Sequence, residues 1–216
     1  VYAMLLKKAR GNGIENIRLL TSLKVMPPVI DWICGEKRDS GIDGFLAPGH
    51  VSVITGSRAF EGLAEKYGIP FVVAGFEGGQ ILAAIGALVK LRGTGKTVNM
   101  YTSAVTREGN RKAQAAVEEY FEPADASWRG MGVIPGSGMV LRKEYEAFDA
   151  GSRALMEDKE RNKGCCCARV LTGKIRPCQC PLFGKVCTPQ TPQGACMVSS
   201  EGSCYNSINS LFAENG

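Results

Sequence analysis

Eight of the nine cysteines in this 216-residue chain lie between Cys165 and Cys204. Long apolar runs end before this segment, so a hydrophobic core of ordinary size cannot hold it together. Small modules with so little apolar volume usually depend on disulfides or on a metal centre for their stability. The clustering therefore predicts a small cysteine-rich module at the C-terminus that is stabilised by sulfur chemistry.

Three kinds of sulfur chemistry could stabilise this module. Disulfides are disfavoured because no export signal is visible and because the three adjacent cysteines at 165–167 pair poorly with one another. Zinc sites usually contain C-x2-C pairs, and the sequence has none. An iron–sulfur cluster accepts four thiolates at irregular spacing. Spacing thus favours a cluster without identifying four ligands among the eight cysteines, and a zinc- or disulfide-stabilised interaction module stays the alternative.

The chain before the cysteines alternates short apolar runs with segments of helical periodicity. The runs predict strands over residues 17–23, 44–49, 70–75 and 98–102. The periodic segments predict helices over residues 27–35, 57–68, 78–93 and 108–122. The predicted strands are apolar throughout, which is typical of a sheet covered on both faces. We therefore predict an α/β fold, Rossmann-like, with a mainly parallel sheet and flanking helices.

Composition divides the chain into three predicted units. Residues 1–124 form the predicted Rossmann-like domain, incomplete at its N-terminus, and residues 165–216 form the predicted cysteine-rich module, for which an iron–sulfur cluster is the favoured chemistry. Residues 125–164 connect them and include a polar, charged helix predicted over 144–164. The chain begins with Val1 inside a helical pattern and shows no signal peptide. We expect it to be part of a longer protein.

Several functional classes are excluded or disfavoured. The net charge of +5 is spread without dense basic runs, so binding to nucleic acid is not predicted. No window reaches the roughly 18 apolar residues of a membrane helix, and we expect a soluble, cytoplasmic protein. The GTGKT string at 93–97 lacks the first glycine of a P-loop, and GMGVIPG at 130–136 lacks the third glycine of the dinucleotide fingerprint. Neither ATP nor NAD is predicted.

Two side chains near the ends of predicted strands are candidates for a ligand cleft. His50, the only histidine, follows the second predicted strand, and Glu77 follows the third in GFEGGQ. Ligands of open α/β sheets bind at the carboxyl ends of the strands. An imidazole can ligate iron or donate a hydrogen bond, and the N–H groups of Gly78 and Gly79 suit an anion. A plain turn histidine and a plain glycine-rich loop stay the alternatives.

The cysteine-rich end carries a specific resemblance. CPLFGKVCTPQTPQGACMVSSEGSC, at 180–204, is similar to the C-terminal signature of the HypD family of hydrogenase maturation factors. Further HypD-like strings follow one another along the chain: VMPPVI (25–30), IDGFLAPGHVSVITG (42–56), PFVVAGFE (70–77), EGN (108–110), WRGMGVIPGSG (128–138) and FDA (148–150). So many strings in one order are improbable by chance, and the resemblance covers essentially all of the chain.

The resemblance implies roles for six of the cysteines. It implies a [4Fe–4S] cluster whose ligands are Cys165, Cys180, Cys187 and Cys204. It also implies a redox-active pair formed by Cys167 and Cys196. Cys166 and Cys178 are additional to the family's usual pattern and lie one or two residues from predicted ligands.

The resemblance further implies a scaffold with a redox function in [NiFe]-hydrogenase maturation. It would assist assembly of the Fe(CN)2(CO) group near His50 with the chaperone HypC and with HypE, which supplies cyanide. The family's N-terminal iron-binding cysteine and C-x2-C pair have no match here. After GFE the family usually has a proline and an aspartate, whereas this chain has Gly78 and Gln80, which leaves Glu77 as the matching acidic residue. An iron–sulfur oxidoreductase acting on a small substrate is a second alternative.

Overall fold

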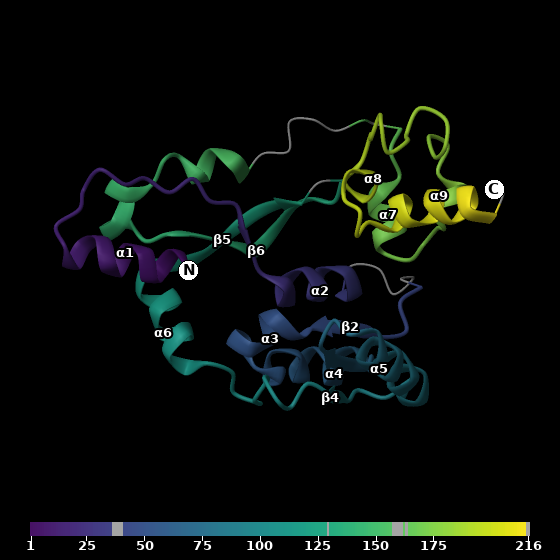
Figure 1. Cartoon of the computed structure of the whole chain (residues 1–216), viewed down its shortest axis with the longest axis horizontal. Helices are drawn as coiled ribbons and strands as arrows, with labels where there is room; N and C mark the ends of the chain where they lie inside the picture. Colours follow the sequence, from purple (N-terminus) through teal and green to yellow (C-terminus); the bar gives the residue numbers. More distant parts are fainter. Residues whose placement is uncertain (36–40, 129, 157–161, 163, 215–216) are drawn as a thin grey trace.

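The computed structural model contains two three-stranded sheets and a compact cysteine-rich module (Figure 1). It describes residues 1–35, 41–128, 130–156, 162 and 164–214. One sheet is parallel, with the order β2-β3-β4, and the other is antiparallel, with the order β1-β6-β5. No helix among the residues described is long and apolar enough to span a membrane.

The parallel sheet is the part of the fold that the sequence predicts best. Its strands are β2 (Phe45–Pro48), β3 (Phe71–Ala74) and β4 (Thr97–Asn99). All four residues of β3 are buried, because this central strand has helices on both of its faces. The predicted parallel sheet with flanking helices is therefore confirmed for this part of the chain.

Alternate residues of β3 pack into two separate cores. Phe71 and Val73 face a core built with α2 (Met26–Gly35), the 3-10 helix η1 (Ser57–Phe60) and α4 (Glu61–Tyr67). Val72 and Ala74 face the opposite core, where α5 (Gly78–Leu91) covers the sheet. Cys34 lies in the first core with 6% exposure and packs there as a small apolar side chain.

A long antiparallel hairpin forms most of the second sheet. It consists of β5 (Phe121–Trp128) and β6 (Gly132–Leu141), and the short strand β1 (Leu23–Lys24) adds to its other edge. The base of the hairpin packs with α1 (Tyr2–Gly11) and α6 (Arg111–Tyr120) around a core that includes Tyr120. Its other end reaches the cysteine-rich module (Figure 1).

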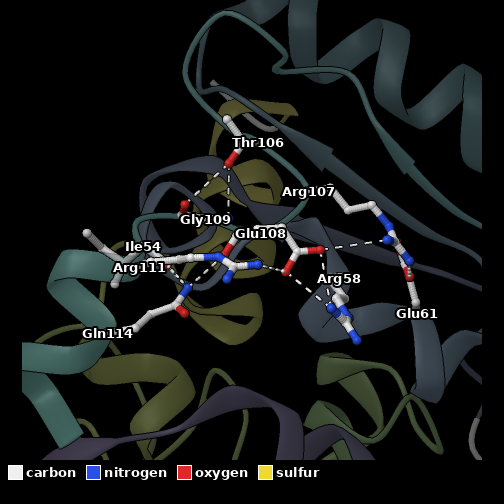
Figure 2. A network of polar contacts seen from close by, with 9 residues as sticks. All are labelled: Ile54, Arg58, Glu61, Thr106, Arg107, Glu108, Gly109, Arg111 and Gln114. Atoms are coloured by element: carbon white, nitrogen blue, oxygen red, sulfur yellow. Dashed lines mark hydrogen bonds and ion pairs between the residues drawn. The ribbon is translucent and has the colours of Figure 1, made fainter.

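The loop before α6 crosses closely over the end of α3 (Gly49–Thr55). Asn110 N–H donates to the Ile54 carbonyl at 3.0 Å, and the Gln114 side chain donates to the same carbonyl at 2.7 Å. Glu108 accepts from Arg58 and Arg111 beside this crossing (Figure 2). These contacts fix the loop onto the helix that begins with Gly49 and His50.

The cysteine-rich module contains only short elements. They are α7 (Cys167–Leu171), the 3-10 helix η4 (Pro177–Gln179), α8 (Ala195–Val198) and α9 (Ser203–Glu214). Besides cysteines, the buried residues of its core are Val170, Met197 and Ile208. So small an apolar core agrees with the predicted dependence on sulfur chemistry.

Three sequence predictions differ from the structure. Residues 17–23 form no strand beyond an isolated bridge at Leu19 and the start of β1. The predicted helix over 108–122 ends at Tyr120, where β5 begins, and the hairpin was not predicted. The predicted helix over 144–164 is replaced by two 3-10 segments, η2 (Lys143–Phe148) and η3 (Ser152–Met156). Gly151 between them has φ +96°, which an α-helix cannot contain, and residues 157–161 and 163 lie outside the described residues.

Candidate metal centre

One cavity in the module brings together the six cysteines to which the sequence assigns roles. Its lining combines these cysteines with three apolar side chains and one glycine: Cys165, Cys167, Val170, Cys180, Phe183, Cys187, Gly194, Cys196, Met197 and Cys204. Cys34, Cys166 and Cys178 are not among the lining residues. The donor atoms are therefore all sulfur, which suits an iron–sulfur cluster or a soft metal ion.

Short helices and turns position these sulfur atoms. Cys167 opens α7, Cys196 lies on α8, and Cys204 lies in the first turn of α9. Cys180 follows η4 directly, and Cys187 forms a bridge with Phe183. Three separate turns and three helix starts thus converge on one point from 40 residues of sequence, from 165 to 204.

Cys167 and Cys196 form a close thiol pair. Their Sγ atoms are 2.8 Å apart, and each residue is only 3% exposed. A disulfide bond is about 2.05 Å long, so the sulfur atoms are near each other without being bonded. The two cysteines that the resemblance implies as a redox pair are therefore adjacent, which is the geometry that reversible disulfide formation requires.

Burial and neighbouring sulfurs keep these groups as thiols. The hydrogen bond with Cys167, together with burial, strongly raises the pKa of Cys196. Burial also raises the pKa of Cys165, and it is the main cause that raises the pKa of Cys204 to about 11. Because ligands bind metal as thiolates, metal binding at this cavity has to displace protons from these sulfurs.

The cysteine sulfurs of the cavity are not placed to coordinate a single metal ion. Among the described residues, no group of three or more His, Cys, Asp or Glu side chains is placed to hold a single ion. A tetrahedral zinc ion with Zn–S bonds of about 2.3 Å requires its sulfurs to lie roughly 3.8 Å apart. A four-iron cube spaces its four thiolates more widely than a zinc ion does, so the two kinds of centre require different sulfur positions.

The backbone at Gln193 and Gly194 approaches two of the sulfurs. Gln193 N–H donates to Cys187 Sγ at 3.4 Å. Gly194 follows it and leaves room for Cys165, because a Cβ there would lie 2.5 Å from Cys165 Sγ. Spacing gives no signal of which glycine packs against a sulfur.

His50 and Glu77 lie at the predicted edge of the parallel sheet. Pro48 and Ala74 are register partners at the carboxyl ends of β2 and β3, and His50 and Glu77 follow them closely. The His50 ring lies against the Phe76 ring with centroids 5.1 Å apart, and His50 and Glu77 are both exposed. The structure therefore brings the two segments together, at a site distinct from the cysteine cavity, and the roles of both residues stay predictions.

A family model named HypD, described as "Hydrogenase formation hypA family", matches residues 1–210. The chain belongs to the HypD family. It is 40% identical over 212 residues to the hydrogenase maturation factor HypD of Cupriavidus necator, covering 94% of this chain and 56% of that protein. The corresponding Escherichia coli K12 protein is 40% identical over 207 residues, covering 94% and 55%. The hydrogenase expression/formation protein HupD of Azotobacter chroococcum is 37% identical over 211 residues, covering 94% and 56%.

Membership of the HypD family supports a role in hydrogenase maturation. The chain spans about half the length of the curated relatives it matches.

Proposed function

We propose that this chain forms the iron–sulfur part of a HypD-type scaffold in [NiFe]-hydrogenase maturation. Cys165, Cys180, Cys187 and Cys204 would hold a [4Fe–4S] cluster. The observation that carries the proposal is that all four line one cavity together with the Cys167–Cys196 pair. When bound, such a cluster supplies one-electron transfer.

The chain's own residues would supply the rest of the chemistry. Cys167 and Cys196 would cycle between two thiols and a disulfide, which their adjacent sulfurs allow. His50 and Glu77, at the carboxyl edge of β2 and β3, would face the iron of the Fe(CN)2(CO) cargo. A HypC-type chaperone and HypE are the proposed partners, and the redox and scaffold roles together distinguish the protein from a classical turnover enzyme.

Iron and acid-labile sulfide per chain test the cluster after anaerobic purification and reconstitution. We expect about four of each, with a broad absorption band near 400 nm. Replacing Cys180 or Cys187 by Ala should remove most of the iron. The matched control is Cys178→Ala, which removes a cysteine of the same module that does not line the cavity.

Two results would reject this proposal. A colourless protein that holds zinc or no metal after reconstitution would leave the cysteine module a structural role only. Equal loss of iron in the Cys178 and Cys187 variants would show that the cavity does not select the ligands. For the partners, co-purification of a HypC-type chaperone with the chain is expected, and turnover of a small donor without it would favour the oxidoreductase alternative.

A further inference from the structure

The outer side of α5 is apolar, although no other described element covers it. Leu82 and Val89 are each 71% exposed, and Ile85 is 47% exposed. The opposite side of the helix, with Ala84 and Leu88, packs onto the parallel sheet. A surface helix normally turns polar side chains to the solvent, and exposed apolar side chains gathered on one face mark an interaction surface. Helix α5 is thus apolar on both sides, which is typical of a helix that is covered on both.

The exposed positions of α5 form a seam with heptad spacing. The seam consists of Gly79, Leu82, Gly86 and Val89, which follow one another at intervals of three, four and three residues and are all exposed. This is the spacing along which two helices pack against each other. A Cβ added to Gly79 or Gly86 would meet nothing within 4 Å beyond the helix backbone. The glycines therefore leave space that a large side chain of another helix can fill.

A second α5 that runs antiparallel fits this seam. In the register that places Leu82 opposite Gly86 of the second copy, Val89 lies opposite Gly79, so every large side chain meets a glycine. The same register places Ile85 of the two copies next to each other, close to a two-fold axis. A parallel pair would instead place glycine opposite glycine and leave holes in the interface.

Charges at the ends of α5 favour the same antiparallel register. Glu77 precedes the first turn, and Lys90 lies in the last turn. Neither side chain makes an ion pair with another described residue. In the antiparallel register, Glu77 of each copy lies beside Lys90 of the other, while residues 78–89 between these ends carry no charged side chain. The face is therefore complementary to itself in shape and in charge.

We propose that two copies of this chain associate through α5, in an antiparallel arrangement about a two-fold axis. The face lies with the parallel sheet, away from α1 (Figure 1), and it shares no residue with the cysteine cavity. The dimer therefore does not depend on the function proposed above. It brings Lys90 of the second copy beside Glu77, which follows β3 at the carboxyl edge of the sheet.

Gly86→Gln and Gly62→Gln make a matched test of the seam. Both glycines are exposed on helices, and an added Cβ at either meets nothing within 4 Å beyond the helix backbone. Glutamine is a better helix former than glycine, so neither change should unfold the chain. Only at Gly86 does the new side chain occupy the space that Leu82 of the second copy needs. Sedimentation velocity over a range of protein concentrations gives the dimer dissociation constant of each chain.

We expect the parent chain to form a dimer and Gly86→Gln to raise its dissociation constant at least about tenfold, the scale of an overpacked contact. Gly62→Gln should stay within about twofold of the parent chain, because α4 packs on the other face of the sheet. A dimer that Gly86→Gln leaves intact would overturn the proposal. A chain that stays monomeric at roughly 100 μM would also overturn it and leave a different protein as the occupant of the face.

Reversal of charge tests the antiparallel register. Lys90→Glu places like charges together at both ends of the pair and should weaken the dimer at least about threefold at low salt. Adding Glu77→Lys restores opposite charges and should return the dissociation constant to within about twofold of the parent value. The control is Lys112→Glu, which makes the same charge change in the exposed first turn of α6. A double variant that does not recover, or equal weakening by Lys112→Glu, would overturn the antiparallel pairing.

The iron content of the same samples separates this proposal from the function proposed above. A chain that dimerises through α5 without binding iron keeps the interface and loses the cluster. A chain that binds iron and stays monomeric keeps the cluster and loses the interface.

Discussion

Gly194 has an extended backbone that any residue can adopt, so the space beside it decides what it tolerates. An alanine methyl group would lie 2.5 Å from Cys165 Sγ, which forces that sulfur to move. We expect Gly194→Ala to weaken iron binding at least roughly tenfold, the scale on which changes around metal ligands act. Chelator competition on the reconstituted chain measures the loss.

The matched control for that change is Gly164→Ala. A Cβ at Gly164 meets Asn162 and Leu182 at 3.4 Å or more, which is ordinary contact. Iron affinity should stay within about twofold of the parent chain, because no ligand has to move. An equal loss in both variants would mean that the module responds to any added methyl group.

Asp31 provides a residue-scale test of pH dependence. Lys66 Nζ donates to its carboxylate at 2.7 Å and Tyr67 Oη donates at 2.8 Å, and these bonds lower the pKa of Asp31. Its contribution to stability is complete above the unfolded pKa of about 3.9 and is lost as the pH falls through the lower folded pKa. Asp31→Asn should lower the free energy of unfolding by about 0.5 kcal/mol at neutral pH, since exposed pairs are screened.

Urea denaturation at two pH values checks this expectation. The difference between the parent chain and Asp31→Asn should shrink at about pH 3 and below. Glu65→Gln removes an exposed carboxylate from the helix that carries Lys66, and it should show a smaller effect at neutral pH. A difference that grows on acidification would contradict the assigned direction of the pKa.

The resemblance indicated which cysteines lie together, but it did not indicate which other residues surround them. The resemblance selected six cysteines, and these six line the cavity while Cys166 and Cys178 do not. Gly130 and Gly194 could not be selected in the same way, because a glycine has the same letter whether it faces solvent or a sulfur atom. Only the packing distinguishes them.

Elements whose residues follow one clear hydrophobic pattern were predictable from the sequence. The run at 70–75 is apolar at every position, and β3 occupies Phe71–Ala74 with both faces covered. The hairpin escaped prediction because Pro123, Gly132, Gly136 and Gly138 interrupt its strands, and such residues normally indicate loops. Helix α3 was not predicted, because it begins at Gly49 directly after a strand and Pro48 provides no side-chain cap.

At the crossing of α3 and the 106–111 loop, the backbones of Gly56 and Gly109 approach each other closely. A Cβ at Gly109 would overlap the Ile54 carbonyl oxygen, and Gly109 also has φ +70°. We expect Gly109→Ala to destabilise the chain by about 3 kcal/mol, adding backbone strain to overpacking. Chemical denaturation followed by circular dichroism measures the change.

Gly93→Ala is the control that separates the cost of backbone strain from the cost of steric overlap. Gly93 has φ +76° and nothing within 4 Å of an added Cβ, so only the backbone cost of about 1 kcal/mol applies. If both variants lose the same stability, the contact between the two segments contributes nothing measurable. Because α3 carries His50 in its first turn, a larger loss in Gly109→Ala would show that the crossing stabilises the fold around this helix.

At the scale of the whole molecule, the hairpin joins two separately packed regions. Phe121 and Leu141 at its base belong to the core formed with α1 and α6. Gly130 at its tip contacts Cys167 in the module. The parallel sheet has cores of its own on both faces. The module also meets the segment before β2, where Gly41 and Ile42 lie against Gly173. Because neither Gly41 nor Ile42 belongs to the cores of the sheet, the sheet should keep most of its stability when the cysteine cavity changes.

Removal of iron should consequently unfold the module and spare the sheet. The module buries three large apolar side chains besides its cysteines, Val170, Met197 and Ile208, which is too few to hold it without a metal centre. Hydrogen exchange measured before and after chelation should lose protection in α7, α8 and the first turns of α9. Protection in β2 and β3, with their buried Ala47, Val72 and Val73, should be unchanged.

Cys178→Ala should behave as the parent chain does, because the Cys178 thiol is exposed and lies outside the cavity. Protection that persists in α7 and α8 without metal would show that the cysteine core folds by apolar packing alone.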